Sequence, residues 1–154
     1  MNQINISHQQ QYLQRQQQIL IQFAQNFPFA KVLDVGCGEL AFPQSIRFRN
    51  YLGIDHDDSA IQIAAGKRPD LSFINTSIDR FSDNQFDIVI CLQKLYQQAT
   101  ETEYWQFLRQ LINRSGKYLI IAGYNSVSDP QAKYYGDLKQ HLTQLFTTTI
   151  NKLP

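Results

Sequence analysis

The stretch Val32-Leu33-Asp34-Val35-Gly36-Cys37-Gly38 decides the fold of this chain. An apolar run that carries one acid and ends in two glycines predicts a buried β-strand followed by a tight turn. Such a turn leaves backbone N–H groups pointing into a crevice, where they can hold a ligand. We therefore interpret the rest of the chain as the fold and the site that are built around this turn.

Length and composition limit the classes of function. A chain of 154 residues suits one domain with a real hydrophobic core. A formal net charge of +1 without basic runs argues against nucleic acid as an obligatory partner. No stretch approaches the roughly 20 apolar residues of a membrane span, and there is no signal-peptide pattern, so we expect a cytoplasmic protein without a membrane partner. Cys37 and Cys91 are predicted to be buried free thiols, and the histidines lack metal-binding spacing, so no metal site is expected.

Strand and helix patterns alternate along the chain. Apolar and β-branched runs predict strands at 31–35, 51–54, 71–74, 86–91 and 118–122, and a further one at 147–150. Helical spacing predicts helices at 7–26, 42–48, 58–66, 101–114 and 138–146. Asp57 or Asp58 caps the third of these helices, and a capping box of Thr100 and Glu103 starts the fourth. This alternation predicts an α/β fold with right-handed βαβ units and a mostly parallel sheet between two helical layers.

Parallel sheets bind ligands beyond the carboxyl ends of their strands. The glycine turn, Asp55 and the segments 75–78 and 91–93 all follow predicted strands, so they are expected to converge on one crevice. Asp55 closes the second strand, where a carboxylate can accept hydrogen bonds from both hydroxyls of a ribose. Asp34 and Asp55 can each be a local cap instead, but their spacing from the glycines favours ligand binding.

The ordered motifs Asp34-Val35-Gly36-Cys37-Gly38, Gly53-Ile54-Asp55 and Phe86-Asp87-Ile88-Val89 resemble those of class I S-adenosylmethionine-dependent methyltransferases. The stretch from Leu108 to Ile121 resembles the helix, turn and fifth strand of the same family. The match runs from Lys31 to Gly123. It implies a Rossmann-like three-layer fold, the methyl donor S-adenosylmethionine and the product S-adenosylhomocysteine.

The resemblance also implies which positions surround the donor. The methionine part would be flanked by Asp34, Gly36, Cys37 and Gly38. The ribose hydroxyls would be held by Asp55, and the adenine would lie against His56, Ser77 and Ile78. The wall by the sulfonium would be lined by Cys91, Leu92 and Gln93.

Some features depart from the family pattern. Leu40 stands where a third glycine is common, and its side chain is expected to open the turn slightly. Ser77 stands where an acid often binds the adenine amino group, unless Asp79 takes that role. We also expect the chain, which ends at Pro154, to lack the usual seventh, antiparallel strand. The sheet edge that this leaves open invites a homodimer contact.

The acceptor side is harder to interpret. Lys94 and Tyr96 follow the fourth strand, and Lys94 replaces a histidine that related enzymes often carry. Tyr124 and Asn125 belong to a polar loop that is expected to face the crevice. Lys94 can instead be a solvated lysine, and the loop can instead be lid packing or surface. No catalytic residue is assigned, because a general base is needed only when the acceptor is a poor nucleophile.

We expect residues 1–154 to form a single methyltransferase-like domain, with an N-terminal helix in 1–28, a cofactor-binding core in 31–123 and a short C-terminal part in 124–154. The N-terminal helix either covers the donor site or packs on the sheet. The expected function is methyl transfer to a small-molecule acceptor. The alternative is a catalytically degenerate protein that binds S-adenosylmethionine or S-adenosylhomocysteine as a binding module. A Rossmann oxidoreductase is disfavoured, because the Gly-x-Gly-x-x-Gly pattern is absent.

Overall fold

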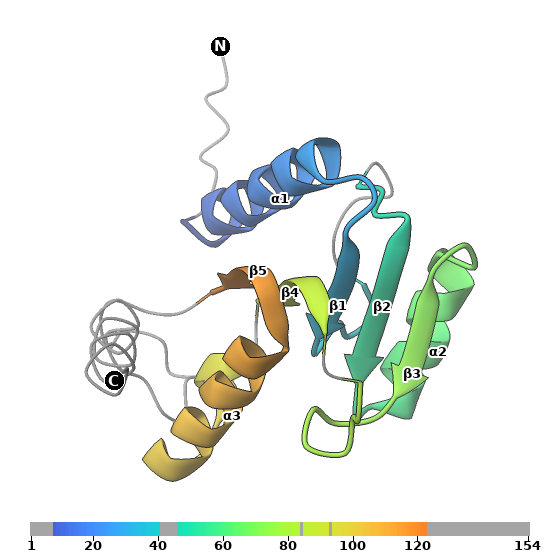
Figure 1. Ribbon diagram of the computed structural model, residues 1–154. Coiled ribbons are helices and arrows are strands. Elements are labelled where there is room, and N and C mark those ends of the chain that lie inside the picture. The colour runs from blue at the N-terminus through green and yellow to red at the C-terminus, as the bar shows by residue number, and fades with distance from the viewer. Residues whose placement is uncertain (1–7, 41–45, 84, 93, 123–154) are drawn as a thin grey trace.

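The computed structural model of the protein describes residues 8–40, 46–83, 85–92 and 94–122. Its sheet has five strands in the order β3-β2-β1-β4-β5, and all neighbouring strands run parallel (Figure 1). The strands are β1 (Lys31–Val35), β2 (Asn50–Asp55), β3 (Ser72–Asn75), β4 (Phe86–Cys91) and β5 (Ser115–Ile121). The predicted Rossmann-like α/β fold is therefore confirmed, and the described part of the sheet contains no antiparallel strand.

Two of the helices begin where capping side chains place them. The described helices are α1 (His8–Asn26), α2 (Asp58–Lys67), the short 3-10 helix η1 (Leu95–Gln97) and α3 (Glu101–Arg114). The side chain of Asp57 accepts hydrogen bonds from the first backbone N–H groups of α2, and Thr100 with Glu103 forms the predicted capping box of α3. Most of the helix predicted at 42–48, and all elements predicted beyond residue 122, lie outside the described residues; residues 46–48 are not helical.

The fifth strand begins earlier than predicted. β5 starts at Ser115, directly after α3, rather than at Tyr118. Ser115 pairs with Phe86, and the pairing then shifts in register before Ile88 pairs with Tyr118. Ser115 and Gly116 lie where the family resemblance implies a turn between the helix and the fifth strand. In the structure they form the start of β5, next to an irregularity in its pairing with β4.

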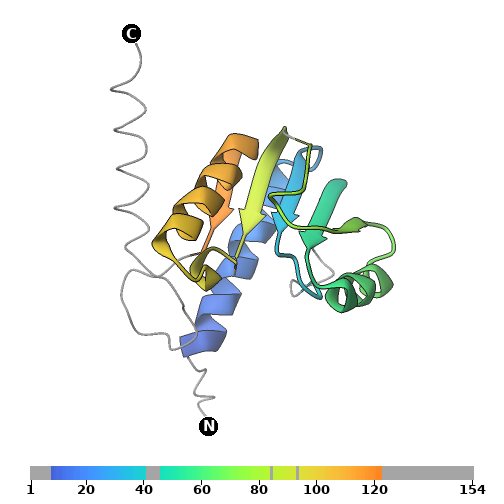
Figure 2. The same ribbon diagram turned by 90° about the horizontal axis from the view of Figure 1, so that it is seen from below.

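Helices cover both faces of the sheet, so the three-layer arrangement is confirmed (Figures 1 and 2). On one face, Leu108 and Leu111 of α3 pack with strand residues such as Leu33 and Val89. On the other face, the core contains side chains from α1, α2 and the strands, among them Leu20, Ala24, Val32, Ala64, Ile88 and Ile90. Leu20 is fully buried, so the second half of α1 packs on the sheet. Packing on the sheet was one of the two roles that the sequence left open for this helix.

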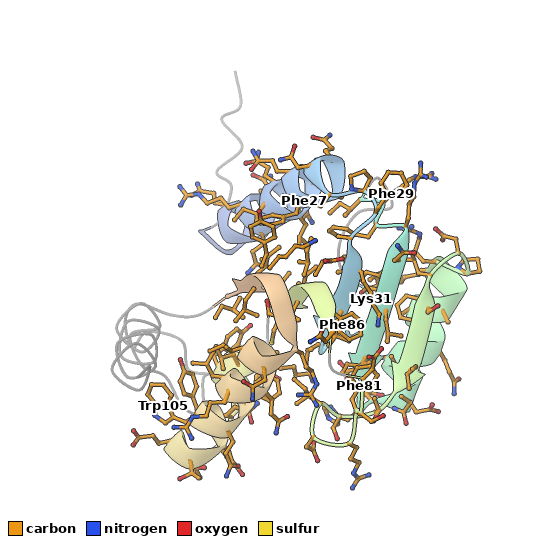
Figure 3. The ribbon with its side chains drawn as sticks, viewed as in Figure 1. Phe27, Phe29, Lys31, Phe81, Phe86 and Trp105 are labelled. Carbon is orange, nitrogen blue, oxygen red and sulfur yellow. The ribbon has the colours of Figure 1, made fainter. Side chains whose placement is uncertain are left out.

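Aromatic and charged side chains surround the amino ends of the strands. Phe27 packs on Tyr118 with ring centroids 4.9 Å apart, and the Lys31 Nζ lies 4.4 Å from the centre of the Phe86 ring (Figure 3). Lys117 pairs with Asp87 at 2.8 Å. Ion pairs this exposed stabilise a fold little. No helix among the described residues combines the length and the apolar character that crossing a bilayer requires.

Candidate donor site

The glycine turn is attached to the end of the neighbouring strand. The backbone N–H groups of Gly36 and Cys37 both donate to the carbonyl oxygen of Ile54, at 2.8 and 3.2 Å. Gly36 has a φ of +75° and Gly38 a φ of +53°, in the left-handed region that glycine adopts most readily. The chain therefore bends sharply away from the sheet directly after β1.

Leu40 also lies in the left-handed region, with a φ of +60°. Its side chain is 5% exposed and packs in the core on the α1 side of the sheet. Burial of a leucine side chain contributes about 2 kcal/mol, which is comparable to the backbone strain of a left-handed L-residue. The turn therefore holds a leucine in a conformation that glycine favours.

Asp55, the last residue of β2, connects the turn to α2. One carboxylate oxygen accepts from the backbone N–H of Gly38 and the other from that of Asp57, both at 3.0 Å. His56 Nδ1 lies 3.2 Å and Lys94 Nζ 3.8 Å from the second of these oxygens. The Asp55 side chain is only 1% exposed, so it forms part of the floor of the site rather than its rim.

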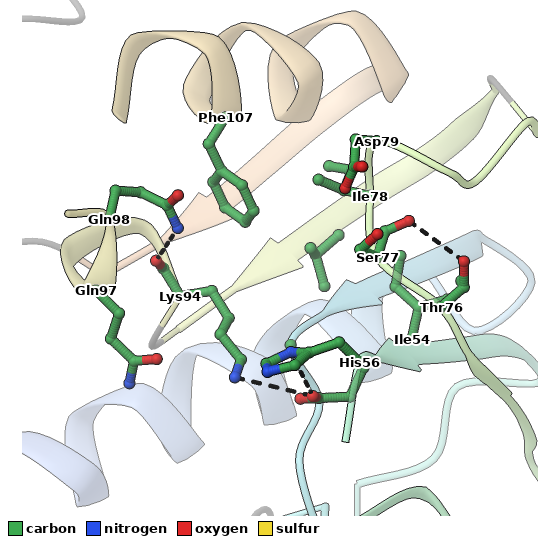
Figure 4. A pocket seen from close by; sticks show the side chains of 13 residues that line it. Ile54, His56, Thr76, Ser77, Ile78, Asp79, Lys94, Gln97, Gln98 and Phe107 are labelled. Atoms are coloured by element: carbon green, nitrogen blue, oxygen red, sulfur yellow. Dashed lines mark hydrogen bonds and ion pairs between the residues drawn. The ribbon is translucent and has the colours of Figure 1, made fainter. Parts of the chain in front are cut away.

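A pocket of about 510 Å³ opens above this floor, beyond the carboxyl ends of the strands (Figure 4). Phe107 reaches into it from α3, and His56 lies on the opposite side. Its lining comes from five segments and combines apolar and polar side chains: Val35, Gly36, Ile54, Asp55, His56, Thr76, Ser77, Ile78, Asp79, Lys94, Gln97, Gln98 and Phe107.

The pocket brings together only part of the predicted site. The predicted residues that line it are Gly36, Asp55, His56, Ser77, Ile78 and Lys94. Those that lie elsewhere in the described structure are Asp34, Cys37, Gly38, Cys91, Leu92 and Tyr96. Gln93, Tyr124 and Asn125 lie outside the described residues. Residues at or just after the carboxyl ends of β1, β2, β3 and β4 therefore meet at this pocket, as the order of the motifs predicted.

Asp34 lies under the glycine turn and is 5% exposed. The Tyr51 hydroxyl donates to its carboxylate at 2.7 Å. Burial raises the pKa of Asp34 to about 7, although the hydrogen bond from Tyr51 opposes this rise. Tyr51 stands opposite Val32 in the sheet and so is a diagonal neighbour of Asp34 on the same face. Tyr51 was not predicted as a partner, because this pairing depends on strand register.

Both cysteines are buried thiols that form no disulfide, as predicted. Burial, together with the nearby Asp34 and Asp55 carboxyls, raises the pKa of the Cys37 thiol well above its usual range. Cys91 is fully buried in the core on the α3 side of the sheet. The thiol of Cys37 therefore stays protonated and is not a nucleophile in the ground state.

Several lining residues were not predicted. The helical spacing of the sequence places Phe107 on the apolar stripe of α3, but its side chain is half-buried and its ring reaches the pocket. Gln97 and Gln98 carried no signal, since a polar residue in a short connection is normally solvated. Gln98 Nε2 donates to the carbonyl oxygen of Lys94 at 2.8 Å, which fixes the turn after β4.

The last residue of α3 supports the far rim of the pocket. Arg114 Nη2 donates to the carbonyl oxygens of Ile78 and Phe81, at 2.9 and 2.8 Å. Ile78 lines the pocket, and Asp79 follows it at the rim. The helix that covers the sheet therefore also holds the turn after β3 in place.

Comparison with known proteins identifies related chains. A family described as a methyltransferase domain matches residues 33–120, which is more than half of the chain. No curated protein sequence matches the chain.

Solved structures share the fold at low sequence identity. Magnesium protoporphyrin IX methyltransferase (ChlM) from Synechocystis PCC 6803, solved with bound S-adenosylmethionine, has a TM-score of 0.66 and 21% identity over 96% of this chain and 74% of that chain. A TehB-like methyltransferase from Corynebacterium glutamicum gives 0.65 and 20%, over 90% of this chain and 82% of that one. The N-methyltransferase NodS from Bradyrhizobium japonicum gives 0.64 and 19%, over 89% and 82%.

Proposed function

Because this chain belongs to the class I S-adenosylmethionine-dependent methyltransferase family, we propose that it transfers the methyl group of S-adenosylmethionine to a small-molecule acceptor. The observation that carries the donor assignment is the position of Asp55. Its buried carboxylate joins the glycine turn to α2 at the floor of a pocket that lies beyond the carboxyl ends of the strands.

The chemistry of the lining fits this donor. A carboxylate oxygen can accept more than one hydrogen bond, so Asp55 can accept from ribose hydroxyls while it holds the backbone. Ile78 and Phe107 offer apolar surface to the adenine, and Ser77 or Asp79 can accept from its amino group. Gly36 lets the methionine part approach the backbone, because no Cβ stands in the way.

The donor, when bound, supplies a methyl group that the sulfonium makes electrophilic. The contribution of this chain is then to orient the donor and to exclude water around the acceptor atom. Asp55 and the glycine turn orient the ribose and methionine parts, while Phe107 and Ile78 shield the adenine side from solvent. We assign no general base.

The small-molecule acceptor rests on charge and on the relatives. A net charge of +1 offers little electrostatic attraction for nucleic acid. ChlM acts, by its name, on magnesium protoporphyrin IX, which is a small molecule. A homodimer through an open sheet edge remains part of the proposal; the described sheet ends at β3 on one side and at β5 on the other.

A donor-binding module without turnover is the second candidate. One feature favours it: Lys94, whose side chain lies within the pocket and reaches towards Asp55, stands where related enzymes often carry a histidine that can act as a base. The release of S-adenosylhomocysteine in the presence of a panel of small acceptors separates the two candidates. An enzyme gives release that depends on one acceptor, whereas a binding module gives none.

Titration calorimetry with S-adenosylhomocysteine tests the donor site. The wild-type protein should bind it, and Asp55→Asn should weaken binding by at least roughly tenfold, because it removes a charged acceptor from two hydroxyls. Asp58→Asn is the matched control: Asp58 lies in the first turn of α2, is exposed and contacts Gln62. Wild-type protein without binding would refute the donor, and unchanged affinity in Asp55→Asn would refute the ribose role.

A further inference from the structure

The Lys94 side chain lies across the floor of the donor pocket (Figure 4). Its methylene groups rest on Gly36: a Cβ placed on this glycine would collide with Lys94 Cγ and would lie 3.0 Å from Cε and 3.1 Å from Cδ. Its ammonium lies 3.8 Å from the Asp55 carboxylate. One side chain therefore covers the open face of the glycine turn and reaches the acid beside it.

The surroundings of Lys94 explain why it points inward. Its carbonyl oxygen accepts from the Gln97 backbone N–H at 3.2 Å and from Gln98 Nε2 at 2.8 Å, so its backbone is fixed at the start of η1. The side chain is 25% exposed, although lysines usually extend their ammonium into water. The methylene groups find apolar contact on the glycine, and the ammonium finds a carboxylate.

These are the surfaces that the proposed donor needs. The methionine part would lie over Gly36, and the ribose hydroxyls would donate hydrogen bonds to Asp55. We propose that Lys94 is a specificity-determining residue of the donor pocket, which competes with the donor for both surfaces and weakens binding of the cationic S-adenosylmethionine more than that of the neutral S-adenosylhomocysteine. This inference rests on the proposed function, because it assumes that the donor occupies this pocket.

The charges that line the pocket bear on the preference between the two ligands. The ionisable groups that line the pocket are the acids Asp55 and Asp79 and the bases His56 and Lys94. S-adenosylmethionine carries one more positive charge than its product, on the sulfonium. A lysine displaced from Asp55 but still tethered at η1 stays near the ligand, and like charges repel more strongly in a partly buried site than in water.

Calorimetric titration of both ligands into four proteins tests the inference. Lys94→Met keeps an unbranched apolar side chain, one atom shorter, and removes the charge. Lys94→Arg keeps the charge, and Lys117→Met removes an exposed lysine at the opposite ends of the strands. In Lys94→Met we expect about threefold tighter binding of S-adenosylhomocysteine, because a weak ion pair no longer has to be broken. S-adenosylmethionine should bind about tenfold tighter, because the repulsion is also removed.

The preference between the two ligands is the quantity that a merely structural role would not change. The ratio of their dissociation constants should move about threefold in Lys94→Met and stay near the wild-type ratio in Lys94→Arg and Lys117→Met. Weaker or unchanged binding in Lys94→Met, with folding verified by circular dichroism, would overturn the competition. An unchanged ratio would overturn the charge effect. If the wild-type protein and all variants bind neither ligand, it is the proposed donor that fails.

Discussion

At the scale of single residues, the backbone of Leu40 is strained, whereas its side chain stabilises the core. Its φ of +60° belongs to a region in which an L-residue is strained by about 1–2 kcal/mol. Its side chain, in contrast, is buried with Leu20 and Ile46 and stabilises the core. The sequence alone predicted that this leucine would open the turn slightly. The structure shows that burial of the leucine side chain offsets the strain of its backbone.

Two substitutions separate these effects. Leu40→Ala and Leu40→Gly both lose the buried side chain and should lower the free energy of unfolding by about 2–4 kcal/mol. Leu40→Gly should be the more stable of the two by about 1 kcal/mol, because only glycine relieves the strain. The same pair at Leu119, half-buried in β5, is the control, and there alanine should be the more stable. Urea denaturation measures all four variants, and the same order at both positions would contradict this account of the turn.

At the scale of elements, α3 both covers the sheet and supports the pocket. Its apolar stripe and its capping box are local signals, so the sequence was sufficient to predict the helix and its start at Thr100. Its contribution to the site was not predictable in the same way. Arg114 reaches carbonyl groups far away in the sequence, and such a contact depends on how the helix is placed over the turn after β3.

Arg114→Met should affect both stability and the site. It leaves the carbonyl oxygens of Ile78 and Phe81 without this donor, so we expect a loss of about 1–2 kcal/mol in the free energy of unfolding. The turn that carries Asp79 should loosen, and the affinity for S-adenosylhomocysteine should fall by about threefold. Arg109→Met, an exposed change on the same helix, should leave both quantities near wild type. Denaturation and calorimetry measure them, and a fall in stability without any change in affinity would confine Arg114 to a structural role.

At the scale of the whole molecule, the order of the motifs was enough to predict the fold. Strand ends in a parallel sheet must meet at one edge, so Gly36, Asp55 and Ser77 were expected near one another, and they line one pocket. What the sequence did not indicate depends on register and on side-chain placement. Tyr51 meets Asp34 because of how β1 and β2 align, and Lys94 covers Gly36 because of how the chain turns after β4.

The buried Asp34 makes the stability of the whole fold depend on pH. Its pKa is about 7 in the folded protein and 3.8 in the unfolded chain, so the folded state holds this proton more tightly. The stability that Asp34 contributes is fully present below pH 4. It is lost between about pH 4 and 7, as the unfolded chain releases a proton that the folded protein retains. Asp70 has the opposite effect, since the hydrogen bond from Arg68 lowers its pKa to about 2 and its contribution is lost towards acid pH.

Asp34→Asn isolates the contribution of this one carboxyl. An asparagine oxygen can still accept from the Tyr51 hydroxyl, so the variant should fold. The free energy of unfolding of the wild-type protein, minus that of the variant, should fall by about 4 kcal/mol between pH 4 and pH 7, then level off. The subtraction cancels Asp70 and every other carboxyl that the two proteins share. Urea denaturation across this range gives the difference at each pH. A difference that stays constant, or that rises with pH, would mean that Asp34 is ionised in the folded protein and that its partner is not Tyr51 alone.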